Sequence, residues 1–510
     1  MKKPVIIAAL FFAAFATSLN AGNIVGKVTC QGKGVPGVQV SDGRDIVLTD
    51  AEGNYSLDSK KDQGFVFIST PSGYVPVMRD ALQADFYAHL TEDADVQESH
   101  DFELLEQNQD TYSVIFFTDA HITNDPKKKD FDLLHDVAAP AMRKTAAELG
   151  GKGPVYLMQL GDFSHDLYWY ENGCNLEDVY NVFLREGFVG PMYSVSGNHD
   201  NDGGVRTDNT DRDSEHLYRK ILGPEYYSLN IGRQHWIFMD DIQYLNVVSE
   251  KMKPNKGIVG DRSYNHGFTG EEMEWLGKDL SFLPDTADVY LCVHIPVIAS
   301  NGRQTFFRDS QMDSLQTMFS RFGKVHVQCG HSHRMEFVDS DKFPAFSEVI
   351  IPAFSGNMWT SKPDRFVGED GEPAGTLSFT FTGRDKDIHY WSHQFGEKNF
   401  RVIDMNQVVS GNPASENKNV VYIEWWMARK GYSLQVLEGR KVRPVEKIVG
   451  QDPYFKMNLP KKTQKSRHLF KVQAKTARKP LVVREVRDSD GAVMYQETVR
   501  RPKPIVPGME

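Results

Sequence analysis

The sequence predicts an α/β core domain between two domains built mainly of β-strands. Residues 109–396 alternate apolar, strand-like runs with segments of helical periodicity, a pattern typical of layered α/β folds. Residues 22–108 and 397–510 contain short strand-like runs separated by turn residues. The chain has 510 residues, of which 40% are hydrophobic and 25% charged, so it is long enough for several folded domains.

Residues 1–21 have the pattern of a signal peptide. Lys2 and Lys3 give a positive amino-terminal region, and residues 5–16 form an apolar segment that ends near small residues. This segment is short for a membrane span, and no later segment has the length and hydropathy of one. We therefore expect an exported protein, periplasmic or secreted, that is not an integral membrane protein. An uncleaved amino-terminal anchor is the alternative.

Residues 22–108 predict a small β-sandwich. Strand-like runs are expected at residues 24–28, 39–40, 46–49, 55–57 and 65–69, with turns at Pro36-Gly37, Asp42-Gly43 and Gly53-Asn54 between them. The motifs around Gly26, Gly37 and Thr49–Tyr55 resemble the carboxypeptidase-regulatory-like sandwich family. That resemblance implies an accessory domain for spacing or docking, without a catalytic role.

Residues 109–396 carry the alternating elements of the core. Strands are expected at residues 112–118, 155–160, 192–195, 289–293 and 325–328, and a hairpin at 226–231 and 235–239. Helices are expected at residues 130–149, 271–282 and 309–322.

Five short motifs follow predicted strands of this core. They are Asp119-Ala120-His121, Gly161-Asp162, Gly197-Asn198-His199-Asp200, His294, and Gly330-His331-Ser332-His333. Carboxylate, imidazole and amide oxygen are ligands of hard divalent and trivalent metals, and loops at the carboxyl ends of strands are where such sheets place ligands. Each motif alone also fits an ordinary turn or a buried histidine. In combination and in this order, they predict a two-metal site.

The five motifs together resemble the calcineurin-like metallophosphoesterase superfamily over about residues 110–340. The resemblance implies a four-layer α/β/β/α sandwich. It also implies two divalent or trivalent metal ions (Mn, Fe, Zn or Ni) and His199 as a catalytic histidine that is not a ligand. One ion would be bound by Asp119, His121, Asp162 and His333, and the second by Asp162, Asn198, His294 and His331. The three-part layout is similar to that of bacterial exported members with a β domain on each side.

Two departures narrow the resemblance. Purple acid phosphatases have a tyrosine ligand three residues after the bridging aspartate, where this chain has His165, so a purple iron centre is not expected. Protein serine/threonine phosphatases have an Asp-Arg pair shortly after Gly-Asp and a glutamate at the end of the next motif. This chain has His165-Asp166 and Asp200 there, which disfavours a phosphoprotein substrate.

The expected activity is hydrolysis of phosphate mono- or diesters. Metals bridged by Asp162 would lower the pKa of a shared water, and the resulting hydroxide would attack phosphorus. His199 would donate a proton or hydrogen bond to the leaving oxygen, and Asp200 would orient His199 or a metal ligand. The candidate substrate contacts are His165, Tyr168, Asn201 and Arg303.

The expected partner is a small phosphate ester or a phosphorylated glycan. Exported location slightly favours diesters or sugar-linked phosphates. Two other readings stay open. The first is a non-catalytic protein that binds anionic or glycan ligands through its metals. The second is a carbohydrate-binding surface protein, for which Trp425-Trp426 gives weak support.

Charge differs along the chain, whose formal net charge is −11. Residues 430–510 contain 19 Lys and Arg against 8 Asp and Glu, a net charge of about +11, so the preceding part is strongly acidic. An acidic body does not suit a general nucleic-acid binder, so nucleic acid is not expected as a main partner. A basic region of this kind is usually a solvated surface. The more specific hypothesis is that it contacts an anionic surface.

The remaining predictions concern the carboxy-terminal strands and the cysteines. Strands are expected at residues 420–427, 432–436, 469–474, 481–486 and 493–499. Of the four cysteines (Cys30, Cys174, Cys292 and Cys329), the last two lie in apolar runs beside metal motifs. A bridge between Cys292 and Cys329 is an open alternative, and we favour buried free thiols.

Overall fold

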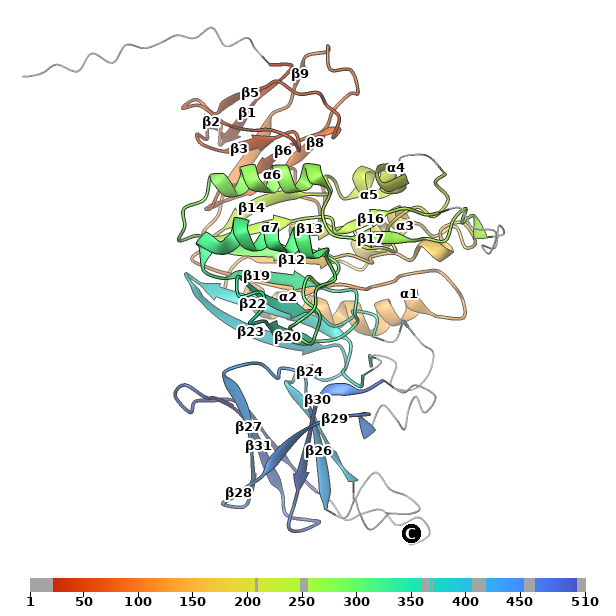
Figure 1. The fold of residues 1–510 in the computed structure, drawn as a ribbon, viewed down its shortest axis with the longest axis vertical. Coiled ribbons are helices and arrows are strands. Elements are labelled where there is room, and N and C mark those ends of the chain that lie inside the picture. The colour runs from red at the N-terminus through yellow and green to blue at the C-terminus, as the bar shows by residue number, and fades with distance from the viewer. Residues whose placement is uncertain are drawn as a thin grey trace, which may run out of the picture.

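The computed structural model describes residues 22–206, 210–247, 256–356, 358–359, 367–368, 370–405, 419–453 and 464–501. The predicted signal peptide at residues 1–21 lies outside the described residues. In the part of the chain that is described, no helix combines the length and the apolar character that crossing a bilayer requires. Figure 1 shows three parts stacked along the long axis, with the α/β core between the two β-rich parts.

The amino-terminal part consists of two facing sheets, as the sequence predicts. The first sheet contains β1 (Ile24–Cys30), β2 (Lys33–Gly34), β5 (Asn54–Leu57), β7 (Tyr74–Pro76), β9 (Glu98–Ser99) and β10 (Phe102–Glu106). The second contains β3 (Gln39–Ser41), β4 (Ile46–Leu48), β6 (Phe65–Ser69) and β8 (Tyr87–His89). Val28, Val40 and Phe102 are buried in the hydrophobic cluster that both sheets share.

The core is built on two large sheets. The first has the order β13 (Met192–Val195), β12 (Val155–Leu160), β11 (Thr111–Phe117), β22 (Gly375–Thr382), β23 (Asp385–Ser392) and β24 (Gly396–Glu397). The second has the order β14 (Tyr227–Ile231), β15 (Gln234–Phe238), β18 (Asp288–Cys292), β19 (Val325–Cys329), β21 (Phe346–Ile350) and β20 (Glu336–Asp339). A small ribbon of β16 (Ile242–Tyr244) and β17 (Tyr264–His266) lies beside them.

Helices cover the outer faces of both sheets. The helices described in the core are α1 (Asp130–Leu133), α2 (Ala139–Gly150), α3 (Leu176–Arg185), α4 (Thr210–Ser214), α5 (His216–Ile221), α6 (Gly270–Ser281) and α7 (Asp309–Phe319), of which α4 and α5 lie beside the β16–β17 ribbon. Met142 of α2 and Phe183 of α3 pack in one cluster with Phe117 of the first sheet. Helices α6 and α7 lie over the second sheet (Figure 1). The predicted four-layer α/β/β/α sandwich is confirmed.

Most predicted core elements are present, within a few residues at their ends. The helix predicted at residues 130–149 is divided by a π-helical turn at Leu134–Ala138, just before Pro140. Proline has no N–H to donate to the preceding turn, so a local irregularity at this point has a direct cause. Strands β22 and β23 were not predicted, although they complete the first sheet by pairing antiparallel to β11.

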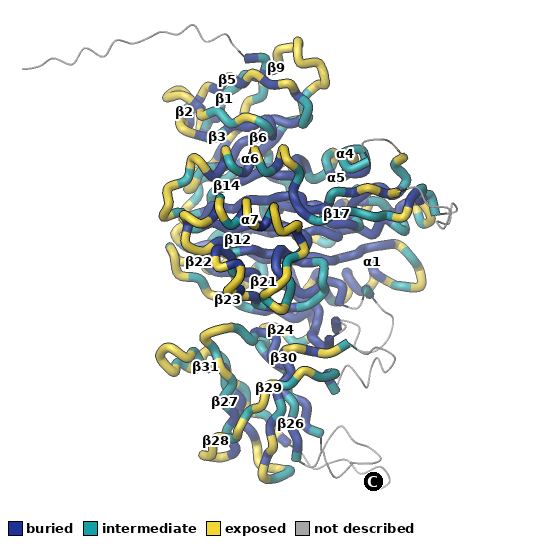
Figure 2. The backbone as a smooth tube through the Cα atoms, viewed as in Figure 1, coloured by how far each residue is buried: buried dark blue, intermediate teal, exposed yellow. Residues whose placement is uncertain are grey.

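The carboxy-terminal part also consists of two sheets. One contains β25 (Phe400–Asp404), β26 (Val420–Trp425), β30 (Ser466–Gln473) and β29 (Val445–Gly450). The other contains β28 (Lys441–Arg443), β27 (Tyr432–Glu438), β31 (Leu481–Arg487) and β32 (Val493–Val499). Figure 2 shows the buried backbone running through all three parts. Trp425 and Trp426 are 3% and 1% exposed, so neither offers a face for stacking on a sugar.

The four cysteines are buried free thiols. Strands β18 and β19 are parallel neighbours, and their register pairs Cys292 with Gln328. Because successive side chains of a strand alternate between faces, Cys329 points to the opposite face of the sheet from Cys292. The open question of a bridge between these two cysteines is thereby answered.

Candidate metal centre

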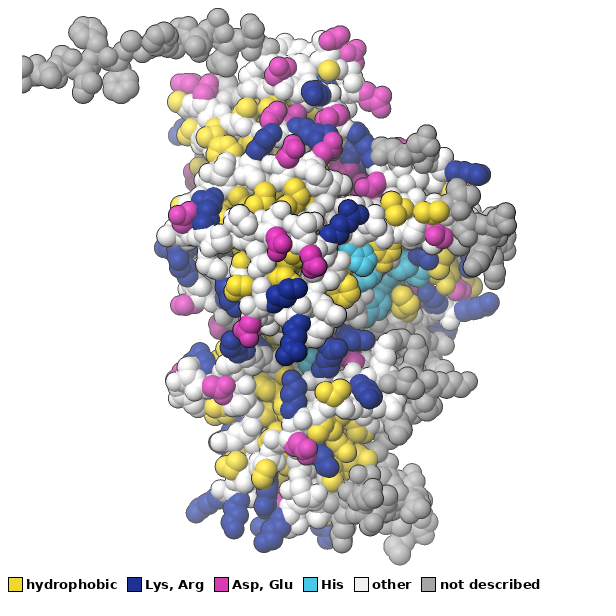
Figure 3. Space-filling view, in the orientation of Figure 1, with side chains coloured by type: hydrophobic (Ala, Val, Ile, Leu, Met, Phe, Trp, Pro, Cys, Tyr) yellow, Lys and Arg dark blue, Asp and Glu magenta, His cyan; other side chains and the backbone are white. Residues whose placement is uncertain are grey.

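The five motifs meet at one end of the two core sheets. Strands β11, β12 and β13 are parallel, and each is followed by one of the first three motifs. Strands β18 and β19 of the other sheet are also parallel and precede the remaining two. Side chains far apart in the sequence therefore converge, and Figure 3 shows histidines gathered on this face of the core.

The first group of converging side chains comprises Asp119, His121 and His333. The Nε2 atoms of His121 and His333 are 2.9 Å apart. Asp119 Oδ1 lies 3.3 Å from His333 Nε2 and 3.8 Å from His121 Nε2. These three atoms point into one small volume.

The second group comprises Asp162, His294 and His331. The Nε2 atom of His294 is 3.3 Å from Asp162 Oδ2 and 3.3 Å from His331 Nδ1. The side-chain oxygen of Asn198 lies 3.3 Å from the same Nε2 atom. The amide of Asn198 therefore belongs to the second group and completes the set predicted for one ion.

Asp162 lies between the two groups. Its Oδ2 atom is 3.7 Å from His121 Nε2 and 3.3 Å from His294 Nε2. Its Oδ1 atom accepts the backbone N–H of His199. Burial alone raises the pKa of this carboxyl, but the imidazoles of His294 and His199 outweigh burial and hold it well below the usual range. Asp162 is thus ionised and within reach of both groups.

The donor set fits metal ions. Two ligand atoms about 2.1 Å from one ion lie ~3–4 Å apart, the separation found in both groups. Asp119 Oδ1 is buried without a hydrogen-bond partner among the described residues. His294 Nδ1 lies 2.8 Å from the carbonyl oxygen of Leu160. A hydrogen bond from Nδ1–H to this oxygen leaves the lone pair of Nε2 free to bind a metal ion. Burial lowers the pKa of His331 to about 4. Burial also lowers the pKa of His294, but the charge of Asp162 outweighs burial and raises it to about 10, so metal binding would displace a proton from His294.

The backbone at these positions is unusual. Five of the seven predicted ligands have positive φ: Asp119, His121, Asp162, His331 and His333, with values between 46° and 62°. Left-handed backbone is uncommon for residues with a side chain and costs about 1–3 kcal/mol at each position. Neighbouring structure holds it in place. For example, Asp119 Oδ2 accepts the backbone N–H of His331.

His199 lies beside the two groups and makes contacts of its own. Its Nδ1 atom is 2.7 Å from Asp166 Oδ1. Arg262 donates from Nε and Nη2 to the same carboxylate, and its Nη2 atom also lies 2.8 Å from His199 Nδ1. Burial lowers the pKa of His199, but the charges of Asp162 and Asp166 outweigh burial and leave it raised. The ring can therefore carry a proton at the edge of the metal groups.

The contacts of Asp200 do not match its predicted role of orienting His199, but they fit the alternative role of supporting a metal ligand. Its carboxylate accepts the backbone N–H groups of Phe163, Ser164 and Gly197. It therefore ties the loop after Asp162 to the loop that carries Asn198. The carboxylate that contacts the His199 ring is Asp166, because the turn at Asp166–Tyr168 brings that side chain under the ring.

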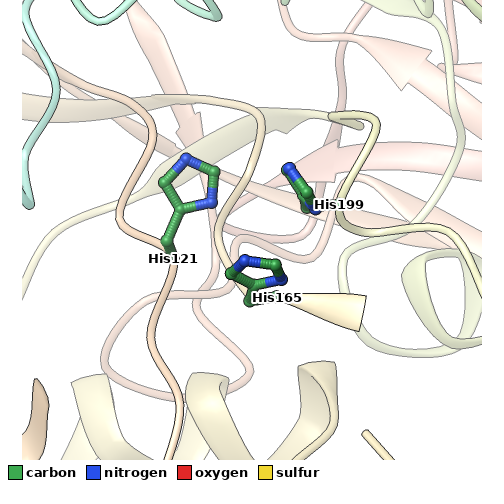
Figure 4. Close-up of side chains that lie close together, drawn as sticks. All are labelled: His121, His165 and His199. Atoms are coloured by element: carbon green, nitrogen blue, oxygen red, sulfur yellow. The ribbon is translucent and has the colours of Figure 1, made fainter. Parts of the chain in front are cut away.

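The four candidate substrate contacts are in different places. The ring of His165 is 4.4 Å from that of His199 and 5.5 Å from that of His121 (Figure 4). Tyr168 packs edge-on against His165 at 5.1 Å. Asn201 is fully buried, and its side-chain amide bonds to Gly197 and Ser214 within the loop. Arg303 is exposed, and no contact of its side chain with the two groups is recorded among the described residues.

Three functional candidates were missed from the sequence. Asp166 stands four residues after Asp162, and its proximity to that motif was the available signal. Arg262 has no local signal, since it comes from the segment before β17. Asp241 is buried and accepts the backbone N–H groups of His294 and Ile295, so it fixes the loop that presents His294.

Comparison with models of protein families assigns the chain to a family. The calcineurin-like phosphoesterase model matches residues 112–335, which hold all seven candidate ligands. The models for the N-terminal and C-terminal parts of calcineurin-like phosphoesterases match residues 22–107 and 348–487. This chain is a calcineurin-like phosphoesterase. It is a hydrolase of phosphoric ester bonds, which decides against the two non-enzymatic readings.

Similarity of the phosphoesterase to solved structures is low. A dimetal phosphatase from Danio rerio is 12% identical, with a TM-score of 0.36, over 56% of this chain and 96% of that one. A purple acid phosphatase from yellow lupin is 13% identical, with a TM-score of 0.37, over 56% and 52%. A 5'-nucleotidase from Candida albicans is 12% identical, with a TM-score of 0.32, over 57% and 53%. No curated protein matches the chain.

Proposed function

We propose that this phosphoesterase hydrolyses small phosphate mono- or diesters at a centre of two metal ions bridged by Asp162. The observation that carries the proposal is the position of Asp162 Oδ2, 3.7 Å from His121 Nε2 and 3.3 Å from His294 Nε2. The residue pattern of 1–21 favours action outside the cytoplasm. Such a location favours diesters or sugar-linked phosphates as substrates.

Asp119, His121, Asp162 and His333 would bind one ion, and Asp162, Asn198, His294 and His331 the other. Bound there, the two ions supply a water of lowered pKa and neutralise the charge on phosphoryl oxygens. Mn, Fe, Zn and Ni all accept this mixture of imidazole, carboxylate and amide donors. Asp241 and Asp200 position the loops that carry His294 and Asn198.

His199 would donate a proton to the leaving oxygen. Its ring is 17% exposed, so one edge is accessible from the surface while Nδ1 faces Asp166. The Asp166 carboxylate fixes the ring orientation and stabilises its protonated form, and Arg262 fixes the carboxylate. The remaining ring nitrogen, Nε2, is then the atom that can serve the leaving group.

The rim beside His199 suits an anionic substrate. His165 and Tyr168 border the histidine group, and the ammonium groups of Lys128 and Lys256 lie 4.6 and 5.8 Å from the centre of the Tyr168 ring. Lys256 is paired with Glu171 at 2.8 Å, so Lys128 is the cation at this rim that would attract an anion. Together with the aromatic ring, this rim would receive the part of the ester beyond the phosphate.

The experiment is a paired assay on p-nitrophenyl phosphate and bis-p-nitrophenyl phosphate with Mn, Zn, Fe and Ni. We expect metal-dependent release from at least one ester, lost in His199→Ala and kept in His389→Ala, a histidine on the remote strand β23. Release from the diester above the monoester would support the diester preference. No release with any metal, from protein shown to contain two ions at this centre, would contradict the proposal.

A further inference from the structure

A second cluster of metal-type side chains lies between the core and the carboxy-terminal part. It consists of Asp370, Glu372 and His468, all of them buried, with one donor atom of each within 4.8 Å of the others. Asp370 and Glu372 lie just before β22 of the core, and His468 lies in β30. None of the three belongs to the five motifs.

The spacing of these atoms does not suit hydrogen bonds. His468 Nε2 and Glu372 Oε2 are 3.8 Å apart, well beyond a hydrogen bond. Neither atom has a hydrogen-bond partner among the described residues, although the two side chains are only 5% and 1% exposed. An unsatisfied buried polar group costs about 1–3 kcal/mol. Two ligands of one ion lie at about this separation, as in the candidate metal centre.

Neighbouring backbone holds the two carboxylates in place. The other oxygen of Glu372, Oε1, accepts the backbone N–H of Met335. Gly371 has φ of +103°, and a Cβ atom there would lie 2.6 Å from Asp452 Cβ, so the turn requires glycine. The backbone N–H of Gly368 closes this turn on the Glu372 carbonyl. The turn therefore presents Asp370 and Glu372 to His468 in a fixed arrangement.

The charges around the cluster favour a cation. The acidic groups that influence it are Asp370, Glu372, Glu336, Glu424 and Asp452, and the basic groups are Lys447, Arg334, Arg401 and Arg467. Arg401 lies 3.1 Å from Asp452, and Arg467 lies 3.7 Å from Glu336. Arg334 partly offsets the charge of Asp370, and burying Glu372 beside it without a further counter-charge is costly. Burial also lowers the pKa of His468 to about 3, so its imidazole is neutral and adds no positive charge.

We propose that Asp370, Glu372 and His468 bind a third metal ion, a divalent transition ion such as Zn²⁺, that joins the carboxy-terminal part to the core. The imidazole donor favours a transition ion over Ca²⁺ or Mg²⁺, which take oxygen ligands. Two ligands come from the core and one from β30, so the ion crosslinks them. Its effect reaches the candidate metal centre, because Glu372 also binds the backbone two residues after His333.

The test is metal stoichiometry on the purified full chain, stripped with a chelator, reloaded with Zn²⁺, desalted and analysed by mass spectrometry. We expect three ions per chain in the unaltered protein and two in His468→Gln and in Glu372→Gln. His326→Gln, a control in strand β19 outside both sites, keeps three. Asp162→Asn separates the sites, since it removes ions from the candidate metal centre and leaves the third. Two ions in the unaltered protein, or three in His468→Gln, would overturn the proposal.

A second measurement does not depend on the variants folding. Crystals of the unaltered protein grown with Zn²⁺ and measured at the zinc absorption edge should show an anomalous peak between His468 Nε2 and the carboxylates of Asp370 and Glu372. The absence of a peak there, with peaks at the candidate metal centre, would mean that protons alone neutralise the cluster and that the proposal is wrong. A peak only in the cluster would support it whatever the outcome of the proposed function.

Discussion

The Nδ1 atom of His199 lies 2.7 Å from the Oδ1 atom of Asp166, a carboxylate that also binds Arg262. This pair fixes which ring nitrogen of His199 is available to a substrate. Burial raises the pKa of Asp166, but the nearby His165 ring, the hydrogen bond from His199 and the charge of Arg262 outweigh burial and lower it. Asp166 is therefore a lasting negative charge beside the ring.

Replacing Asp166 tests its role as a positioning residue. We expect Asp166→Asn to lower kcat by about 10–100-fold while two ions remain at the metal centre, since Asp166 contacts the histidine and not the ions. The measurement is kcat and metal content side by side. Asp279→Asn is the matched control, because Asp279 bonds His235 at 2.8 Å in a buried pair of the same kind away from the site. Unchanged kcat in Asp166→Asn would show that the contact has no catalytic consequence.

Removing the imidazole of His199 should affect chemistry alone. We expect His199→Ala to reduce kcat by about 10²–10⁴-fold with metal content unchanged, because general acid catalysis is worth that much and the ring is not a predicted ligand. Only the backbone N–H of His199 bonds Asp162, and alanine retains it. Loss of an ion together with activity would instead make His199 a ligand.

Asp162→Asn should have the opposite pattern. The amide is neutral and a weaker bridge, so we expect at least one of the two ions of the metal centre to be lost together with activity. Metal analysis of the variant with the candidate third site disabled by His468→Gln isolates this centre. Retention of both ions with near-normal turnover would rule out a bridging role.

We expect the buried side chain of Glu348 to make the free energy of unfolding depend on pH. Burial raises the pKa of this β21 side chain from 4.5 to about 8. The folded protein thus retains a proton that the unfolded chain releases, so this contribution is full below about pH 4.5 and is lost as the pH rises through about 8. Glu348→Gln cannot titrate, and its amide oxygen can still accept the N–H groups of Val297 and Ile298.

We expect the free energy of unfolding of Glu348→Gln to fall less between about pH 5 and pH 8 than that of the unaltered protein. One group contributes at most about 1.4 kcal/mol per pH unit. Urea unfolding at several pH values measures the difference. Parallel curves for the two proteins would show that Glu348 does not titrate in this range.

Contact of the basic carboxy-terminal region with an anionic surface remains a hypothesis. Lys and Arg side chains gather at the lower end of the molecule (Figure 3), and exposed ones include Arg440, Lys441, Arg478 and Lys479. Changing these four to glutamate should lower the salt concentration that elutes the protein from heparin resin. Four changes of the same kind at exposed lysines and arginines of the core are the control. Equal shifts in the two variants would mean that net charge alone matters.

The sequence predicted the metal groups because each ligand directly follows an apolar strand. The pattern of apolar residues predicted β11, β12, β13, β18 and β19. Because neighbouring strands among them pair in parallel, their carboxyl ends lie at one edge of each sheet. The candidate substrate contacts Asn201 and Arg303 did not rest on this strand-end argument. The structure gives Asn201 a supporting role inside the loop, where its amide satisfies the buried Gly197 carbonyl and Ser214 hydroxyl.

Other features depend on contacts that sequence spacing does not encode. Arg262 reaches Asp166 from 96 positions away, and Asp241 reaches His294 from 53. Strand β22 alternates Leu377, Phe379 and Phe381 with small polar residues, a period-2 signal that was readable. Its pairing with β11, more than 250 residues earlier, could not be predicted from the sequence, because pairing depends on the packing of the whole sandwich.

Anomalous diffraction from crystals grown with Mn²⁺ tests whether Asp162 bridges a pair of ions. We expect two peaks ~3.5–4 Å apart, with Asp162 Oδ2 between them. One peak should lie among Asp119, His121 and His333, and the other among Asn198, His294 and His331. One peak, or two peaks that Asp162 does not touch, would contradict this expectation.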